Sequence, residues 1–162
     1  MANSEKPIEQ AVSNDNASRR LARLAVVQGL YQIALTQHSA DQIVRDFRDH
    51  PPPLSSDKGT GETLAGMDAE LFGEIVTGVT EHSADLDTMI AGAFDAKISA
   101  ARVEILLRAI LRAGAYELHH HAKIPAAVII NDYVDVTHAF FAAKEPGLVN
   151  GVLDKLAKTL RS

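Results

Sequence analysis

The stretch Ile105–Leu118 reads ILLRAILRAGAYEL, and eleven of its fourteen residues are apolar or glycine. Its apolar side chains point in nearly every direction around a 3.6-residue turn, which predicts a helix that is buried on most sides. Ser99 upstream and Pro125 downstream are boundary signals, so we expect one helix of about 20 residues. The rest of the chain is expected to pack around it.

Three charged residues interrupt this apolar stretch, namely Arg108, Arg112 and Glu117. A charge that is buried without a partner is costly, so each side chain is expected to reach water or a group on a neighbouring element. The simpler interpretation of these charges is structural: they fix how the central helix docks against its neighbours.

Helical spacing of apolar residues continues on both sides of the central helix, and no stretch alternates convincingly as a strand. The expected class is therefore all-α, a bundle of about six to seven helices joined by short connections. A first helix is predicted from Ser18, as N-cap, to about Thr36, and further helices are predicted at Asp41–His50, Ala126–Ala143 and Leu148–Leu160. The segment from Asp68 to about Phe94 is predicted to form either one long helix or two helices with a bend near His82–Asp85.

Two segments contain few residues that could be buried. Residues 1–17 are rich in Asn, Ser, Glu and Ala, which predicts a disordered tail ahead of a single domain at 18–162. Pro51–Pro53 ends the second helix, and the Ser, Gly and Thr that follow predict a mobile loop over about 51–67.

The composition is that of a soluble globular protein, with 46% hydrophobic and 23% charged residues. The chain has no cysteine, which excludes disulfides and thiolate metal sites and favours a reducing compartment. The polar N-terminus does not resemble a secretory signal, and no stretch is long and apolar enough to span a membrane. We therefore expect a cytoplasmic location and no contact with a membrane.

The net charge of −5 conceals an uneven distribution. Residues 59–96 contain eight acids and no Lys or Arg, whereas residues 16–40 contain three Arg and no acid. Residues 144–162 contain four Lys or Arg and two acids. The ends could bind a polyanion and the middle a basic protein, although uneven charge is also common on small domains.

No pattern typical of an enzyme or a cofactor site is present, so we expect neither catalysis nor a cofactor. The sequence has no P-loop, GxGxxG or GxSxG motif. His119–His121 are adjacent at a helix end, where their side chains point roughly 100° apart and cannot share one metal ion well. Binding is therefore the better hypothesis.

Arginine, amide and aromatic groups suit unpaired RNA, because cations bind phosphates while rings and guanidinium planes stack on bases. Three arginines lie in the first turns of the predicted first helix, where positive charge opposes the helix dipole; an anionic ligand or a solvated surface would explain them. If the first and last helices lie together, the candidates for RNA contact are Arg19, Arg20, Arg23, Gln28, Lys144, Asn150, Lys155 and Lys158.

The buried seam of the first helix is predicted from a stripe of residues spaced three and four apart. Leu21, Leu24, Gln28, Tyr31 and Leu35 form this stripe, which places Gln28 and Tyr31 at or beside the seam.

Five segments occur in an order that resembles the NusB family of bacterial transcription antitermination factors. They are RRLARLAVVQGLYQ, FGEIVTGV, AILRAGAYEL, IPAAVIINDYVDVTHAF and LVNGVLDKLAK, and they extend from about Arg19 to Leu160. The resemblance implies an all-α fold of two helical sub-bundles. It also implies binding, together with the ribosomal protein NusE, to the boxA element of ribosomal RNA leader transcripts. The pair would join other Nus factors on RNA polymerase and suppress termination.

Carried over by position, the resemblance implies roles for individual residues. RNA contacts are implied at Arg19, Arg20 and Arg23, second-rank ones at Asn150 and Lys155, and a NusE contact at Tyr31.

Three residues depart from the family pattern. Asp132 stands where glutamate is usual, and Leu107 stands where many members have a glutamate implicated in the partner contact. Lys144 stands where some members have an acid near the RNA, and a lysine there should strengthen the attraction to phosphate.

Two alternative functions belong to other classes. A related helical domain precedes the catalytic domain of some ribosomal RNA cytosine methyltransferases, but 162 residues leave no room for that catalytic domain. The other alternative is a structural homodimer whose interface is the central helix or seam. NusB-like proteins include dimers that conceal the RNA surface, so a homodimer is compatible with the first hypothesis as a storage form.

Overall fold

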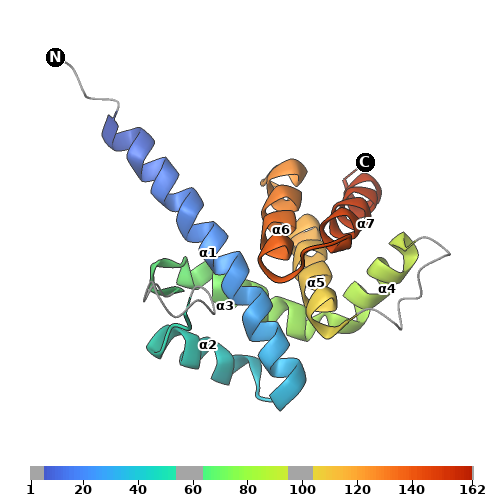
Figure 1. Ribbon diagram of the computed structural model, residues 1–162, viewed down its shortest axis with the longest axis horizontal. Coiled ribbons are helices and arrows are strands. Elements are labelled where there is room, and N and C mark those ends of the chain that lie inside the picture. Colours follow the sequence, from blue (N-terminus) through green and yellow to red (C-terminus); the bar gives the residue numbers. More distant parts are fainter. Residues whose placement is uncertain (1–5, 54–63, 95–103, 162) are drawn as a thin grey trace.

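The computed structural model describes residues 6–53, 64–94 and 104–161, and their side chains from residue 15 onward. Within these ranges the chain forms helices and no strand, so the predicted all-α class is confirmed (Figure 1). The elements are α1 Lys6–Thr36, α2 Ala40–Asp49, the 3-10 turn η1 Leu64–Gly66, α3 Ala69–Glu81, α4 Ser83–Ala93, α5 Ile105–His120, α6 Ala126–Phe140 and α7 Glu145–Leu160.

The central helix is α5, as the sequence predicts. It packs against α1, α3, α4, α6 and α7, and ten of its sixteen residues are buried. The helices α1, α2 and α3 pack on one another and form one group, while α4, α6 and α7 each pack on α5 and form a second group with it. Because α5 also packs against α1 and α3, it joins the two groups (Figure 1). Its first residue is Ile105, and the predicted start at Ser99 lies outside the described residues.

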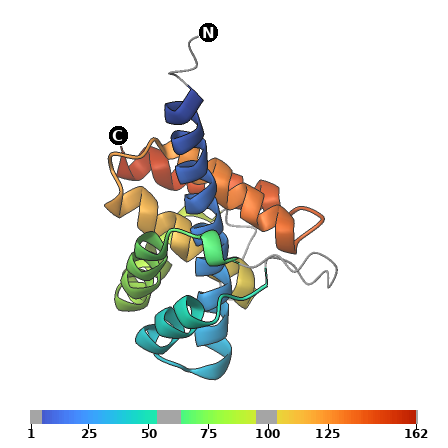
Figure 2. The ribbon, with the colours of Figure 1, turned by 90° about the vertical axis from the view of Figure 1, so that its left-hand side faces the viewer.

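The first helix begins at Lys6, so the predicted start at Ser18 is wrong, and residues 6–17 are helical where a disordered tail was predicted. Its first turns extend beyond the other helices (Figures 1 and 2). Helix propagation adds one hydrogen bond for each residue that is fixed, so a helix nucleated on the core can continue without burial. Pro7 is compatible with this because proline is tolerated in the first turn.

The connection from α2 to α3 is anchored at its end. Leu64 is fully buried, and its backbone N–H donates to the carbonyl of Pro52 at 2.9 Å. The N–H of Asp68 donates to the carbonyl of Ser18 at 3.0 Å, which ties this connection to α1. The predicted loop over 51–67 therefore ends in an ordered turn, and residues 54–63 lie outside the described ranges.

The segment from Asp68 to Phe94 forms two helices, the second of the two alternatives that the sequence left open. Asp68 caps α3 by accepting a hydrogen bond from the N–H of Leu71 at 3.1 Å, and the break between α3 and α4 is at His82. The last connection lies earlier than predicted, because α6 ends at Phe140 and α7 already includes Glu145. Pro146 fits in the first turn of α7, where its missing N–H is not needed.

In the described part of the chain, no helix has the length and apolar character that crossing a membrane requires.

Candidate nucleic-acid interface

Arg19 and Arg20 lie on the surface of α1, near the point where this helix packs against α6. The side chain of Arg20 is 66% exposed, and its Nε lies 3.5 Å from Oδ1 of Asp132 on α6. Two adjacent exposed guanidinium groups on one helix can bind phosphates, because a guanidinium donates paired hydrogen bonds to an oxyanion.

Arg23 lies one turn further along α1 and is only 2% exposed. Its Nε and Nη2 donate to the two carboxylate oxygens of Glu117 at 2.8 and 2.9 Å, and its Nη1 donates to Oδ2 of Asp132 at 2.6 Å. A guanidinium that is buried and has each of its three nitrogens bonded to a carboxylate is not accessible to a phosphate. The prediction that Arg23 contacts RNA is therefore wrong for this structure.

Glu117 on α5 is the centre of a buried polar network. Besides Arg23, it accepts a hydrogen bond from the hydroxyl of Tyr133 at 2.6 Å, and Nδ1 of His121 lies 2.9 Å from it. Burial alone would raise the pKa of Glu117, but the hydrogen bonds with His121, Arg23 and Tyr133 outweigh it and lower the pKa to about 2. The carboxylate thus stays charged inside the bundle and joins α1, α5 and α6.

His121 extends this network to α3, because its Nε2 lies 2.5 Å from Oε2 of Glu74. The hydrogen bond with Glu117 raises the pKa of His121, and Glu74 adds to that effect while burial opposes it. The hydroxyl of Tyr116 also donates to Glu74, at 3.1 Å, and burial together with Glu74 raises the pKa of Tyr116 to about 12. Four helices therefore meet at one set of paired charges.

Arg112, another charged residue of the central helix, also pairs with a neighbouring helix. Nε and Nη2 of Arg112 donate to the two carboxylate oxygens of Asp87 on α4, both at 2.7 Å. Arg108 is half-buried. As expected from the sequence, Arg112 and Glu117 pair with groups on neighbouring helices, and they fix how α5 docks.

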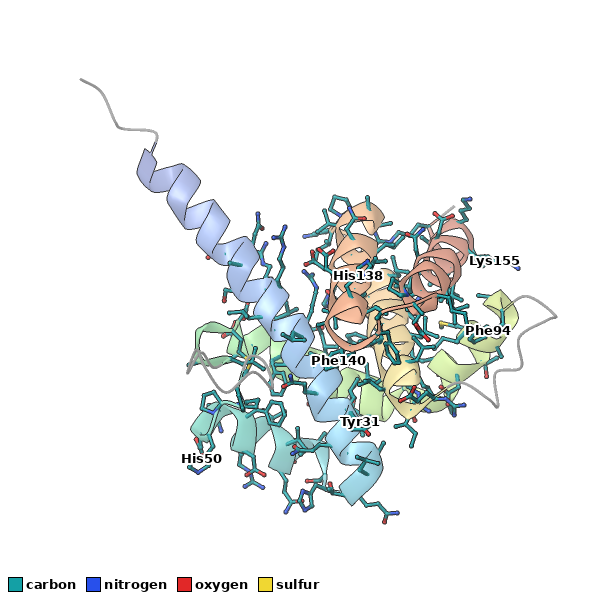
Figure 3. All side chains as sticks on the ribbon, in the orientation of Figure 1. Tyr31, His50, Phe94, His138, Phe140 and Lys155 are labelled. Atoms are coloured by element: carbon teal, nitrogen blue, oxygen red, sulfur yellow. The ribbon has the colours of Figure 1, made fainter. Side chains whose placement is uncertain are left out.

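The last helix does not bring all its predicted residues to α1. Lys144, Asn150 and Lys155 are exposed, but α7 packs against α4, α5 and α6. Figure 3 shows Lys155 on the opposite side of the bundle from α1, and in Figure 2 the α6–α7 turn projects away from α1. Lys158 is also exposed and pairs with Asp154 at 3.1 Å. The arginines of α1 and the lysines of α7 therefore do not form one continuous patch.

Gln28 and Tyr31 are half-buried, as the stripe on α1 predicted, whereas Leu35 is 56% exposed. Leu107, where many family members have a glutamate, is only 6% exposed. Figure 3 shows Tyr31 on the side of α1 that faces α5 and Phe140.

A groove of about 430 Å³ lies between α1, α3, α4 and α5, and Leu30, Ile33 and Ala34 line it from α1. Its lining is mostly apolar, with Ile105 47% exposed at the start of α5. No sequence pattern predicted this groove, because it forms between four helices that meet only in the folded chain. Its lining residues are Leu30, Ile33, Ala34, Val79, Thr80, Ser83, Ile105, Arg108, Ala109 and Arg112.

The histidine run is placed for packing and pairing. The rings of His120 and Tyr116 stack with their centroids 4.3 Å apart, and His121 belongs to the buried network. Within residues 6–53, 64–94 and 104–161, no group of three or more His, Asp or Glu side chains is arranged to hold a metal ion.

Comparisons with known proteins agree on one family. The family model described as "NusB family" matches residues 20–158. The transcription antitermination protein NusB of Rhodopseudomonas palustris (strain HaA2) is 39% identical over 165 residues, which cover 99% of this chain and 96% of that protein. Its counterpart in Allorhizobium ampelinum is 40% identical and covers 98% of this chain and 94% of its own. Among solved structures, T. maritima NusB matches with a TM-score of 0.68 and 27% identity, covering 86% of this chain and 90% of that one.

Proposed function

The chain belongs to the NusB family of transcription antitermination proteins, and we propose that it binds the boxA element of ribosomal RNA leader transcripts together with NusE. In this proposal it is a non-catalytic adaptor in the cytoplasm that joins other Nus factors on RNA polymerase. The exposed pair Arg19 and Arg20 on α1 is the observation that carries the RNA contact.

The charge around this pair supports the proposal. Residues 16–40 contain no acid, and the third arginine of this stretch is already neutralised inside the bundle, so Arg19 and Arg20 supply the positive charge at the surface. Single-stranded RNA binds such positions through its phosphates. Lys144 and Asn150 are exposed but are not continuous with Arg19 and Arg20, so in this proposal they are weaker, separate candidates for RNA contact. Gln28 and Lys155 are also weaker candidates, because Gln28 is half-buried and Lys155 lies across the bundle.

The double variant Arg19→Ala with Arg20→Ala is expected to bind boxA RNA roughly tenfold to a hundredfold more weakly than the wild type. Each lost phosphate contact should also reduce the slope of log affinity against log salt by about 0.7. A titration of labelled boxA RNA at several salt concentrations, with and without NusE, measures both quantities.

The matched control is Arg45→Ala with Arg48→Ala, which removes the same charge from two exposed positions on α2. This control is expected to retain nearly the wild-type affinity and salt slope. Equal affinity and slope in the α1 variant and the wild type would contradict the proposed RNA contact.

For NusE we propose the surface around Tyr31 on the C-terminal half of α1, which also carries the exposed Leu35 and the residues that line the groove from α1. Apolar surface next to a tyrosine is typical of the centre of a protein interface. We expect Tyr31→Ala to weaken binding of purified NusE about tenfold, while boxA binding by the protein alone and the melting temperature change little. Unchanged NusE affinity would exclude this surface; a smaller molar mass of the free variant would instead assign the surface to a homodimer.

A further inference from the structure

We propose that Asp132 is a positioning residue for RNA binding, which holds the guanidinium of Arg20 ready for a phosphate. The inference rests on the proposed function and deepens it, because it assigns a role to an acid beside the RNA-binding arginines. The argument depends on the two carboxylate oxygens of Asp132, which face different surroundings.

One oxygen of Asp132 belongs to the interior. Oδ2 accepts the 2.6 Å hydrogen bond from Nη1 of Arg23, and Arg23 is itself fixed by its two hydrogen bonds to Glu117. The side chain of Asp132 is 8% exposed, so the carboxylate has little freedom to turn. It is therefore a fixed point at the edge of the buried network.

The other oxygen faces the surface. Oδ1 lies 3.5 Å from Nε of Arg20, whose side chain is 66% exposed. An arginine carries five N–H donors, so a contact at Nε leaves the four donors of the two terminal nitrogens for a ligand. A long exposed side chain normally loses rotamer freedom on binding, and holding it in advance reduces that loss. Asp132 thus prepares Arg20 for the phosphate.

This role predicts an effect opposite in sign to that of simple charge. Asp132→Asn removes a negative charge beside a polyanion, which by Coulomb interaction alone would strengthen RNA binding. If Asp132 positions Arg20, the same variant should bind boxA RNA about threefold to tenfold more weakly. The two interpretations are therefore distinguished by the direction of the change.

Three comparisons isolate the effect of the pair formed by Asp132 and Arg20. Asp135→Asn makes the same charge change at an exposed position three residues further along α6, and it is expected to bind RNA as tightly as the wild type or slightly more tightly. In an Arg20→Ala background, Asp132→Asn should cause no further loss of affinity, because the residue that it positions is absent. Asp132→Glu keeps the carboxylate and is expected to retain most of the affinity.

Asp132 also contacts Arg23, so Asp132→Asn can destabilise the fold. A second measurement uses the unmodified protein: the Nε–Hε signal of Arg20 in ¹⁵N NMR should exchange with water more slowly than that of Arg19. Equal exchange at the two arginines, or tighter RNA binding by a folded Asp132→Asn variant, would overturn the inference. A wild-type protein that ignores boxA RNA would instead refute the proposed function, while the exchange measurement still reports on the contact.

Discussion

Replacing Glu117 with alanine is expected to lower the free energy of unfolding by about 3–5 kcal/mol, because it leaves the charge of Arg23 buried with one of its two carboxylate partners removed. Tyr133 and His121 lose the same acceptor, so side chains from α1, from α6 and from the C-cap of α5 lose hydrogen bonds together. Urea or thermal unfolding followed by circular dichroism measures the change. A destabilisation below 1 kcal/mol would show that the network contributes little to the fold.

The control for this variant is Glu70→Ala, which removes an exposed glutamate from the first turn of α3. It is expected to change the free energy of unfolding by about 1 kcal/mol or less, through the lost interaction with the helix dipole. The contrast between the two variants separates the loss of a buried, paired carboxylate from the loss of a surface charge.

The pH dependence of the Glu117→Ala effect follows from the pKa of this residue. Its folded pKa of about 2 lies below the ordinary value of 4.5, so the ionised carboxylate contributes stability that is complete above about pH 4.5 and is lost as the pH falls toward 2. The difference in unfolding free energy between wild type and variant should therefore narrow over that range. A difference that stays constant down to pH 2 would contradict the ionised state of Glu117.

The central helix could be predicted from the sequence because a long apolar stretch is stable only in the protein interior, away from water. The same argument predicted that Arg112 and Glu117 would find partners, since a buried charge must be paired. It could not identify the partners: Asp87 lies 25 residues from Arg112, and Arg23 lies 94 residues from Glu117. Which helices face each other is a property of the tertiary packing.

The misassignment of Arg23 has a related cause. The predicted seam of α1 ran through Leu21, Leu24 and Gln28, all of which are only half-buried. The buried face is turned by about one residue and includes Ala22, Ala25 and Val26, which brings Arg23 inward with it. On an alanine-rich helix the phase of the buried face is weakly defined by sequence, because small residues are compatible with either side.

The arginine cluster therefore has two roles that its sequence did not separate. Arg19 and Arg20 lie on the surface, whereas Arg23 is buried. The surface and the interior are linked by Asp132, which contacts both Arg20 and Arg23. The family resemblance implied the same RNA-binding role for all three arginines. Their different burial shows that each needs to be assigned a role separately.

A second large effect is expected at Gly78 on α3, where a methyl group would collide with an aromatic ring. A Cβ at this position would lie 2.3 Å from two ring carbons of Tyr116 and 2.5 Å from its hydroxyl oxygen. The ring is 7% exposed, stacks on His120 and donates to Glu74, so it cannot move without losing these contacts. We expect Gly78→Ala to lower the free energy of unfolding by about 3 kcal/mol.

Gly92 on α4 provides the matched control, because a Cβ there meets no atom within 4 Å from the described residues outside its own helix. Gly92→Ala is expected to raise the stability by about 0.5–1 kcal/mol, since alanine is the better helix former at an unobstructed position. The same chemical change should therefore have opposite signs on two adjacent helices, as measured by thermal unfolding of both variants. If Gly78→Ala were as stable as Gly92→Ala, the close approach of Tyr116 to α3 would be disproved, and the contact between Tyr116 and Glu74 would lose its structural support.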